Sequence, residues 1–276
     1  MNIISLFDGI SCLQLALKDA GIEYDNYFAS EINKDAIKVT QHNFPNTIQL
    51  GDVRGIDFNS LPEMDLIGCG SPCQDISGLN NNGKGLAGQK SSLFYYFKKA
   101  RERWPNAKFI VEQVQGKDSK IISRELKIRH MKLNSLLVAP QKRNRLYWSN
   151  ILVRELPKKS TLLLKDILQQ SVDSKYYQSE KWLKWWEKNN VHQMSHSYSS
   201  LNADYAYCLT ARMYASWQGN YWRDEKGIRR LTPIECERLQ TIPDGYTSII
   251  SDNKAYEAIG NGWTVKIISH ILKYMK

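Results

Sequence analysis

The amino-terminal half of the chain alternates short apolar runs with amphipathic stretches. Five apolar runs are the length of buried strands, at residues 3–6, 27–30, 47–50, 64–69 and 108–111. Between them, apolar side chains recur at helical spacing over residues 12–20, 34–43 and 91–103. Strands that alternate with helices are typical of a parallel sheet covered on both faces. The pattern therefore predicts an α/β fold.

The alternation is lost after about residue 157. Residues 174–190 are rich in lysine and tryptophan, and residues 191–226 show little periodicity, which indicates a small, irregular lobe. Residues 229–240 are predicted to form a helix with Thr232 as its N-cap and Pro233 in the first turn. Apolar residues return at helical spacing over 260–276.

Charge narrows the choice of partner. The 276 residues contain 38 Lys and Arg against 28 Asp and Glu, a formal net charge of +10. Such a balance favours an anionic partner, nucleic acid foremost. No apolar run approaches the roughly 20 residues that span a bilayer, so we expect no membrane association.

Five cysteines, an odd number without framework spacing, argue against a disulfide scaffold: Cys12, Cys69, Cys73, Cys208 and Cys236. With no secretory signal at the start of the sequence, they predict a reducing, cytoplasmic compartment. The Cys69–Cys73 and His192–His196 pairs lack the paired spacing of a structural zinc site, so we predict no metal.

Cys73 is the first candidate for chemistry. It stands in Ser71-Pro72-Cys73-Gln74, directly after a predicted buried strand. Ligands of open α/β sheets bind at the carboxyl ends of strands, although a free cysteine is more often a small buried side chain. The Gly- and Asn-rich stretch 75–90 that follows is predicted to be a lid over this site.

Further polar residues follow other strands. Phe7-Asp8-Gly9-Ile10-Ser11 forms a turn that opens the first helix, where a helix amino terminus favours anionic groups. Glu31 follows the second strand, where an acidic residue accepts hydrogen bonds from ribose hydroxyls, and Asp52 follows the third, near an adenine amino group. Together they predict a nucleoside site, although each acid alone reads as a solvated loop charge.

A carboxylate and two arginines complete the set. Glu112 ends the strand 108–111 and is expected on the same sheet edge as Cys73, where a partly dry carboxyl group can donate a proton. Arg143 and Arg145 occupy alternate positions, so in one strand they would point to one face. Guanidinium groups suit a base carbonyl or a phosphate, although a basic surface strand would look the same.

In this order, the motifs resemble those of the cytosine-5 DNA methyltransferase family. The likeness covers about residues 1–150 and 229–276 and rests on Phe7-Asp8-Gly9, Glu31, Asp52, Pro72-Cys73-Gln74, Glu112, Gln141-x-Arg143-x-Arg145, Arg230-Leu231-Thr232-Pro233-x-Glu235-Cys236, Leu239-Gln240 and Gly260-Asn261. Phe7-Asp8-Gly9-Ile10 and Gly262-Trp263 are similar to the eukaryotic de novo enzymes. The resemblance implies a Rossmann-like S-adenosylmethionine-dependent methyltransferase fold with a small, irregular target-recognition lobe. It assigns residues 1–165 to catalysis and cofactor binding, 166–228 to target recognition, and 229–276 to a segment that returns to the catalytic domain.

The resemblance also implies a reaction. A methyl group passes from S-adenosylmethionine to carbon 5 of cytosine in double-stranded DNA, leaving S-adenosylhomocysteine, after the base is flipped out of the helix. Cys73 would attack carbon 6, Glu112 would hold ring nitrogen 3, and Arg145 would contact the base carbonyl. Arg143 joins this catalytic set.

Contacts to the cofactor and to DNA follow residue by residue. The implied cofactor contacts are Phe7, Asp8, Gly9, Ile10, Glu31, Ile32, Asp52, Val53, Pro72, Leu93, Asn261 and Trp263. The expected DNA contacts are Gln74, Ser77, Gln141, Arg143 and Arg212. The tryptophans of residues 181–186 suit either a DNA-facing surface or helical core packing.

Two positions depart from the family pattern. Gln113 stands where the family usually has asparagine, and Cys12 stands where many relatives have glycine. Neither side chain makes or breaks bonds in the reaction, so we expect activity.

Two rival functions remain open. A tRNA-directed branch shares these motifs, and Cys208-Leu209-Thr210 partly matches its Cys-Phe-Thr element, although we favour DNA. A catalytically silent DNA-binding accessory protein is disfavoured because Cys73, Glu112 and Arg145 are all present. The expected setting is a monomer that acts in restriction-modification beside a cognate restriction endonuclease, and on the nucleoid if the source is bacterial.

Overall fold

The chain folds into two compact units. The computed structural model describes residues 1–70, 93–116, 119–188, 200–214 and 219–275. Unit 1 contains Met1–Asn134, Asn144–Pro157 and Val265–Lys276, and unit 2 contains Ser135–Arg143 and Lys158–Thr264. Of the segment 229–276, the part from Val265 onward belongs to unit 1.

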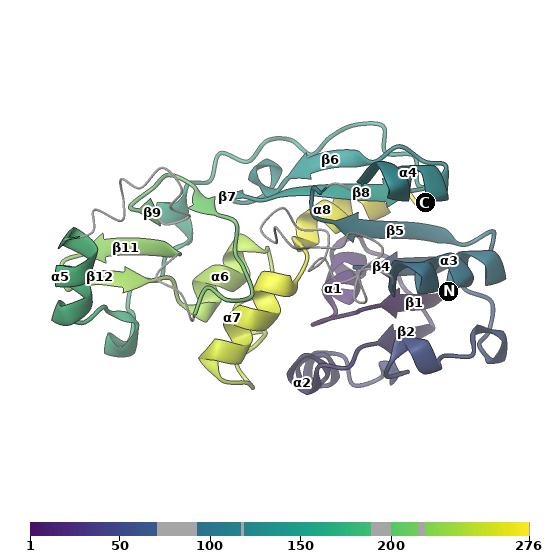
Figure 1. Ribbon diagram of the computed structural model, residues 1–276, viewed down its shortest axis with the longest axis horizontal. Coiled ribbons are helices and arrows are strands. Elements are labelled where there is room, and N and C mark those ends of the chain that lie inside the picture. Colours follow the sequence, from purple (N-terminus) through teal and green to yellow (C-terminus); the bar gives the residue numbers. More distant parts are fainter. Residues whose placement is uncertain (71–92, 117–118, 189–199, 215–218, 276) are drawn as a thin grey trace. The chain divides into compact units, whose positions relative to one another are not determined.

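Unit 1 is built on a seven-stranded sheet of order β3-β2-β1-β4-β5-β8-β6 (Figure 1). Its strands are β1 (Asn2–Leu6), β2 (Asn26–Ser30), β3 (Ile48–Gln49), β4 (Leu66–Cys69), β5 (Lys108–Gln113), β6 (Met131–Asn134) and β8 (Asn144–Ser149). The first five are parallel to one another, and β8 runs antiparallel to both β5 and β6. The five predicted strands are confirmed, and β5 extends two residues further, so that Glu112 lies within it.

One face of this sheet is covered by α3 (Phe94–Arg103) and α4 (Ser119–Leu126). Alternate strand residues Ile67, Val111 and Trp148 share a buried cluster with Phe97 of α3 and Ile122 of α4. Burial of such side chains contributes roughly 1.5–3 kcal/mol each, which is why the apolar runs form the core strands.

The opposite face is covered by α1 (Cys12–Asp19) and α8 (Val265–Leu272), which pack against each other. A Cβ built on Gly68 of β4 would lie 2.5 Å from Leu13 Cδ2, so glycine allows α1 to approach the sheet closely. The Ser269 hydroxyl donates to Asp19 and ties α8 to the end of α1. The carboxyl-terminal helix thus lies beside the helix that follows β1. Helix α2 (Lys34–Asn43) has the predicted bounds, with Asn33 as its N-cap.

Unit 2 is smaller and less regular. A two-stranded sheet pairs β7 (Gln141–Lys142) with β10 (Ala206–Tyr207), and a three-stranded sheet holds β9 (Ser200–Leu201), β11 (Asn220–Asp224) and β12 (Gly227–Arg230). Its helices are α5 (Glu180–Lys188), α6 (Pro233–Leu239) and α7 (Asp252–Asn261).

The tryptophans of α5 form a small core in unit 2. Trp182 stacks on Trp186 at 4.6 Å between ring centroids, and both rings contact Tyr221. Trp186 is buried, whereas Trp185 is 41% exposed. Core packing therefore accounts for two of the three tryptophans.

The predicted helix 229–240 was wrong at its start. Arg229 and Arg230 lie in β12, paired with β11, and α6 begins at Pro233. The helix starts at Pro233 because proline lacks an N–H and its fixed φ suits a first helical position. Thr232 is the N-cap and forms a capping box with Glu235.

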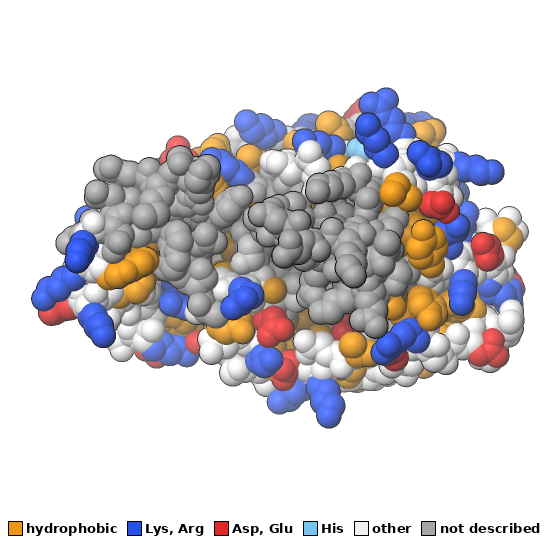
Figure 2. Space-filling model, in the orientation of Figure 1, with side chains coloured by type: hydrophobic (Ala, Val, Ile, Leu, Met, Phe, Trp, Pro, Cys, Tyr) orange, Lys and Arg blue, Asp and Glu red, His pale blue; other side chains and the backbone are white. Residues whose placement is uncertain are grey.

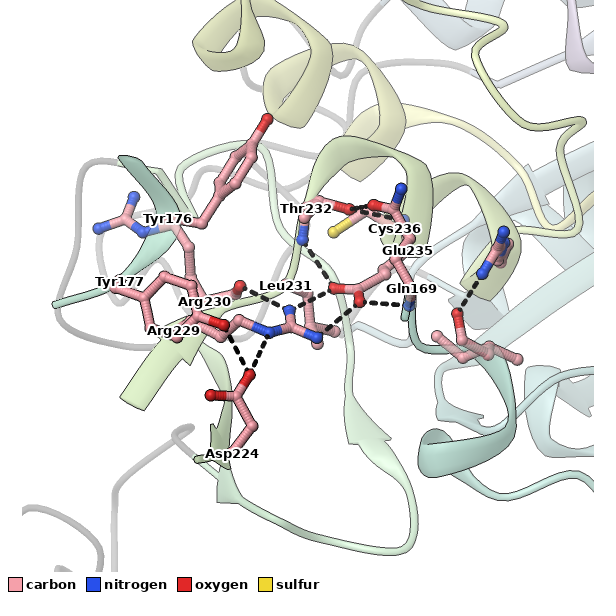
Figure 3. A network of polar contacts seen from close by, with 12 residues as sticks. Gln169, Tyr176, Tyr177, Asp224, Arg229, Arg230, Leu231, Thr232, Glu235 and Cys236 are labelled. Atoms are coloured by element: carbon pink, nitrogen blue, oxygen red, sulfur yellow. Dashed lines mark hydrogen bonds and ion pairs between the residues drawn. The ribbon is translucent and has the colours of Figure 1, made fainter. Parts of the chain in front are cut away.

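A buried ion pair joins β12 to α6 (Figure 3). The two terminal nitrogens of Arg229 each lie 2.8 Å from an oxygen of Glu235, and both side chains are almost fully buried. Glu235 also accepts from the main-chain nitrogens of Thr232 and Gln169, at 2.9 Å each. Every oxygen of this buried carboxylate is thus engaged.

No helix in the described ranges is both long enough and apolar enough to cross a membrane.

Candidate active site

The turn after β1 has an unusual backbone. Phe7, Gly9 and Ser11 have φ values of 61°, 59° and 57°, the left-handed region that non-glycine residues rarely adopt. Strain of this kind costs about 1–3 kcal/mol per residue and is concentrated at functional sites. The sequence predicted the turn but not its strain.

Asp8 points into unit 1 and joins a polar network behind this turn. Its carboxylate accepts hydrogen bonds from the Ser11 hydroxyl and, at 2.7 Å, from the Tyr27 hydroxyl. Burial raises the pKa of Asp8 to about 6, although the hydroxyl donors partly offset this effect. Gln14 extends the network by donating to Ser11 Oγ and Thr47 Oγ1, at 2.9 Å each. Asp8 was expected to contact the cofactor, but its carboxylate is engaged inside the fold.

Glu31, at the carboxyl end of β2, fixes the same turn. Glu31 Oε2 accepts from the main-chain nitrogen of Gly9 at 2.8 Å, while Oε1 accepts from those of Ile32 and Asn33 at 2.8 Å. A carboxylate has about four acceptor sites, and Oε1 uses both of its own, so the remaining capacity lies on Oε2. Glu31 is thus rigidly held and can accept one further hydrogen bond, from a ligand hydroxyl.

Asp52 follows β3 and caps a short helical turn. It accepts from the Arg54 main-chain nitrogen at 2.9 Å and from Arg54 Nε at 3.0 Å. The Arg54 hydrogen bonds lower the pKa of Asp52 to about 2, so this carboxylate is charged at neutral pH.

The residues at this edge suit a nucleoside ligand. A Cβ built on Gly9 or Gly51 would meet no heavy atom within 4 Å, so open space borders both glycines. Ile32 is 67% exposed, so it offers an apolar side chain next to Glu31. Phe7 and Leu93 are partly buried, whereas the side chains of Ile10 and Val53 lie inside the core, so only their main chain can face a ligand.

Glu112 and Arg145 form an ion pair at the end of β5. Arg145 Nε lies 2.8 Å from Glu112 Oε1, and the two side chains are only 14% and 12% exposed. Antiparallel pairing sets Glu112 opposite Tyr147 of β8, so Arg145 projects on the same face two residues further along. The structure brings these two predicted residues together.

Strand β4 delivers the chain to this pair. Cys69 of β4 is level with Val111 of β5, so the chain leaves β4 beside Glu112. Cys73 itself, the neighbouring Pro72, Gln74 and Ser77, and the predicted lid 75–90 lie outside the described residues. The departure at Gln113 is accommodated, because its buried amide oxygen accepts from the main-chain nitrogen of Val114 at 2.8 Å.

Arg143 and Arg145 do not share a face of one strand, contrary to the expectation from their spacing. Arg143 follows β7 in unit 2, and Arg145 lies in β8 of unit 1. Arg143 is buried and donates to the carbonyls of Leu209 and Gly262, at 2.9 Å each, and of Gly260 at 3.3 Å. Its guanidinium is thus occupied by main-chain carbonyls.

Gln141 belongs to the same buried cluster in unit 2. Its amide nitrogen donates to the Leu239 carbonyl at 3.0 Å, and its amide oxygen accepts from the Leu209 main-chain nitrogen at 2.9 Å. Gln240 donates to the Gly262 carbonyl at 3.1 Å and accepts from the Thr264 hydroxyl at 2.7 Å. Burial of Gln141 and Arg143 argues against the DNA contacts expected of them. The sequence gives no sign of the structural roles of Gln240 and Thr264, beyond the place of Leu239-Gln240 among the motifs.

The remaining predicted residues also lie in unit 2. Arg212 and Asn261 are exposed, and Trp263 is buried. Gly260 is restricted by its surroundings, because a Cβ there would lie 2.4 Å from the Thr210 carbonyl carbon. Among the described residues, no group of three or more His, Cys, Asp or Glu is placed to hold a metal ion.

Comparison with known proteins agrees with this geometry. The family model described as "C-5 cytosine-specific DNA methylase" matches residues 1–276. The chain is 28% identical to the Type II methyltransferase M.NlaX of Neisseria lactamica, over 100% of this chain and 96% of that protein. Its structure is similar to that of the methyltransferase EhMeth of Entamoeba histolytica, with a TM-score of 0.79, 16% identity and coverage of 100% and 97%. A DNMT2 mutant of Spodoptera frugiperda gives a TM-score of 0.76, 23% identity and coverage of 99% of both chains. At such identities the two structures establish the fold alone, and they confirm the predicted fold class.

Proposed function

The chain belongs to the C-5 cytosine-specific DNA methylase family, and from this premise we propose that it methylates carbon 5 of cytosine in duplex DNA through a covalent Cys73 adduct. The observation that carries the proposal is the ion pair between Glu112 of β5, the strand next to β4, and Arg145 of β8. A largely buried carboxylate held by a guanidinium is suited to orient a planar base that carries both donors and acceptors.

In the proposed reaction, the Cys73 thiolate adds to carbon 6 of an extruded cytosine. Glu112 holds ring nitrogen 3, and Arg145 donates to the base carbonyl, which makes carbon 5 nucleophilic. After carbon 5 accepts the methyl group it loses its proton, and expulsion of Cys73 restores the aromatic ring. The reaction therefore requires the Cys73 thiolate to reach carbon 6 of the extruded base.

Membership of this family and fold implies the use of S-adenosylmethionine. When bound, S-adenosylmethionine supplies an electrophilic methyl group. We propose that Glu31 accepts from its ribose hydroxyls, that Asp52 accepts from its adenine amino group, and that Ile32 covers the adenine ring. The open space beside Gly9 and Gly51 supports this assignment. Asn261 and Trp263 are further proposed contacts.

We also propose duplex DNA as the partner, in keeping with the net charge of +10. We further propose that the protein acts as a monomer and that it is paired with a cognate restriction endonuclease.

Bisulfite sequencing of DNA from cells that express the protein tests activity, substrate and sequence context together. The purified protein should also form a covalent adduct with duplexes that contain 5-fluorocytosine. Cys73→Ser should abolish the adduct, whereas Cys208→Ser, which changes a half-buried thiol of unit 2, should retain it. Methyl transfer to bulk tRNA but not to duplex DNA would overturn the choice of substrate.

A further inference from the structure

Five exposed cations gather at one margin of unit 1. Lys120 and Arg124 lie on α4, Lys127 directly follows it, and Arg129 and Lys132 lie on the way into and within β6. Lys and Arg side chains, blue in Figure 2, are frequent on the surface that overlies α4 and β6 in Figure 1. We call these five residues the α4–β6 basic surface.

The secondary structure places these residues along one margin of the sheet. Lys120 and Arg124 are four residues apart and so lie on one side of α4, and Lys127 directly follows the helix. Lys132 pairs with Leu146, which belongs to the same buried cluster as Ile122 of α4, so Lys132 projects on the sheet face that α4 covers. Strand β6 is the last strand of the sheet. The surface therefore runs along an open edge.

The carboxylates that the structure describes nearby do not pair with these cations. Glu125, the acid of α4, is paired with Lys98 of α3. Among the residues that the structure describes, no ion pair links any of the five cations to a carboxylate. Like charges at these spacings repel one another, which offsets what Arg124 and Lys127 gain from the dipole at the carboxyl end of α4.

Lys127 shows the same conflict most clearly. Its φ is 54°, and hydrogen bonds from Ile128 N to Ser123 O and from Lys127 N to Arg124 O, both 3.2 Å, close a Schellman motif. This position usually carries glycine, because a Cβ is strained in the left-handed region. Lysine therefore places a positive charge at a position where the backbone favours glycine.

One end of the surface lies near the catalytic edge of unit 1, with the Lys132 side chain on the sheet face opposite to that of Glu112. Lys132 pairs with Leu146, which pairs with Gln113, so Lys132 is level with the residue after Glu112. Two strand spacings separate them, about 10 Å. Duplex DNA presents a phosphate about every 1.7 Å along its axis, so a duplex near Glu112 extends well past this distance.

We propose that the α4–β6 basic surface binds the phosphate backbone of duplex DNA outside the methylated site. The inference rests on the proposed function only in naming duplex DNA as the ligand. Contacts to phosphates are independent of base sequence, so the surface would raise affinity for long duplexes without setting specificity.

The test compares two variants of equal net charge. The surface variant carries Lys120→Gln, Arg124→Gln, Lys127→Gln, Arg129→Gln and Lys132→Gln. The control variant replaces five exposed, dispersed cations of unit 1 with glutamine, at Lys18, Lys38, Lys108, Arg154 and Lys273. Affinity for a long duplex, of about 40 bp, is measured as a function of salt, together with methyl transfer at saturating DNA.

For the surface variant, the negative slope of log affinity against log salt should become less steep by about four to five, because each of the five phosphates no longer neutralised contributes about 0.9 to it. The control slope should change by less than about one, and kcat at saturating DNA should stay within about twofold of wild type for both variants. Equal slopes for the two variants, a fall in kcat in the surface variant alone, or a slope change seen with tRNA but not with DNA would each overturn the proposal. If the two variants differ in slope as expected but the wild-type protein methylates no DNA, the proposed function is refuted, whereas the proposed phosphate binding by the α4–β6 basic surface is retained.

Lys127→Gly provides a second test that does not depend on five simultaneous changes. It should raise Tm by about 2–4 °C, because glycine adopts the left-handed backbone without strain. It should also make the slope of log affinity against log salt less steep by about one. An unchanged slope together with the rise in Tm would contradict the proposed binding of phosphate by Lys127.

Discussion

Glu112 and Arg145 show how much of the chemistry is fixed by single side chains. Each is largely buried, and each is the other's charged partner at 2.8 Å. Such a pair gains little net stability, because desolvation offsets the attraction. Its position at the end of β5 is better explained by a role in holding a base.

Glu112→Gln should therefore lower kcat for methyl transfer by about 10²- to 10⁴-fold, since an amide cannot share a proton with ring nitrogen 3 as a carboxyl group does. Steady-state kinetics at saturating DNA measure this effect. Glu63→Gln, at an exposed acid paired with Arg103, serves as the control and should leave kcat unchanged. A decrease of less than about threefold at Glu112 would contradict the assigned role.

Asp8 makes stability depend on pH at the residue scale. Its pKa is about 6 in the folded chain against an ordinary 3.8, so the folded state holds this proton more tightly than the unfolded state. Burial of the ionised carboxylate therefore destabilises the protein progressively as pH rises from about 4 to above 6.

Relative to Asp8→Asn, the wild-type free energy of unfolding should fall by about 1–3 kcal/mol across this pH range. Urea denaturation of both proteins at several pH values measures the difference. Because the comparison uses the pH dependence, hydrogen bonds that asparagine cannot make at any pH do not affect it. A difference that stays constant from about pH 4 to 7 would show that Asp8 titrates normally.

At the scale of elements, the junction of β12 and α6 depends on the buried pair of Arg229 and Glu235 (Figure 3). Glu235 caps α6 and neutralises Arg229 at the same time. Removal of Glu235 leaves the buried guanidinium of Arg229 with one partly exposed partner, Asp224, at 3.4 Å from Nε. A buried charge compensated so weakly is far more costly than the pair is favourable.

Glu235→Ala should destabilise the protein by about 3–5 kcal/mol. Asp244→Ala, which removes the partly exposed partner of Arg238, should cost no more than about 1 kcal/mol. Chemical denaturation of the two variants distinguishes these cases. Similar decreases in stability for both would mean that burial does not govern the energy of the β12–α6 junction.

At the scale of the whole molecule, the chain crosses between its two units within two residues. Arg143 binds main-chain carbonyls of unit 2, and Arg145 binds Glu112 of unit 1. Gln141, Gln240 and Thr264 complete the polar cluster that joins distant segments of unit 2. Neighbouring motif positions thus serve separate cooperative regions.

Arg143→Ala should leave several buried carbonyls of unit 2 without a donor, at about 1–3 kcal/mol for each. Hydrogen exchange should therefore accelerate in β11 and α7 of unit 2 more than in β1 and β2 of unit 1. Arg212→Ala, at an exposed arginine of unit 2, should leave both regions unchanged. Uniform acceleration across the two units would indicate that they unfold as one.

The sequence by itself determined the inner parallel strands β1, β2, β4 and β5, because they are largely apolar runs that burial on both faces satisfies. It also placed Glu31, Asp52 and Glu112 at strand ends, since the order of strands and helices fixes which residues lie at one sheet edge. The N-cap at Thr232 could be predicted for a similar local reason, because Pro233 and Glu235 follow it at the spacing of a capped helix.

Only the tertiary structure decided where side chains with several suitable partners would point. Alternation along the chain predicted one face for Arg143 and Arg145. In the structure, however, Arg143 donates to main-chain carbonyls that are 66 or more residues away in the sequence. Likewise, Asp8 turns inward because Tyr27 and Ser11 offer hydroxyl donors there. Periodicity records local geometry, whereas the partner of a buried polar group is set by non-local packing, which no short motif contains.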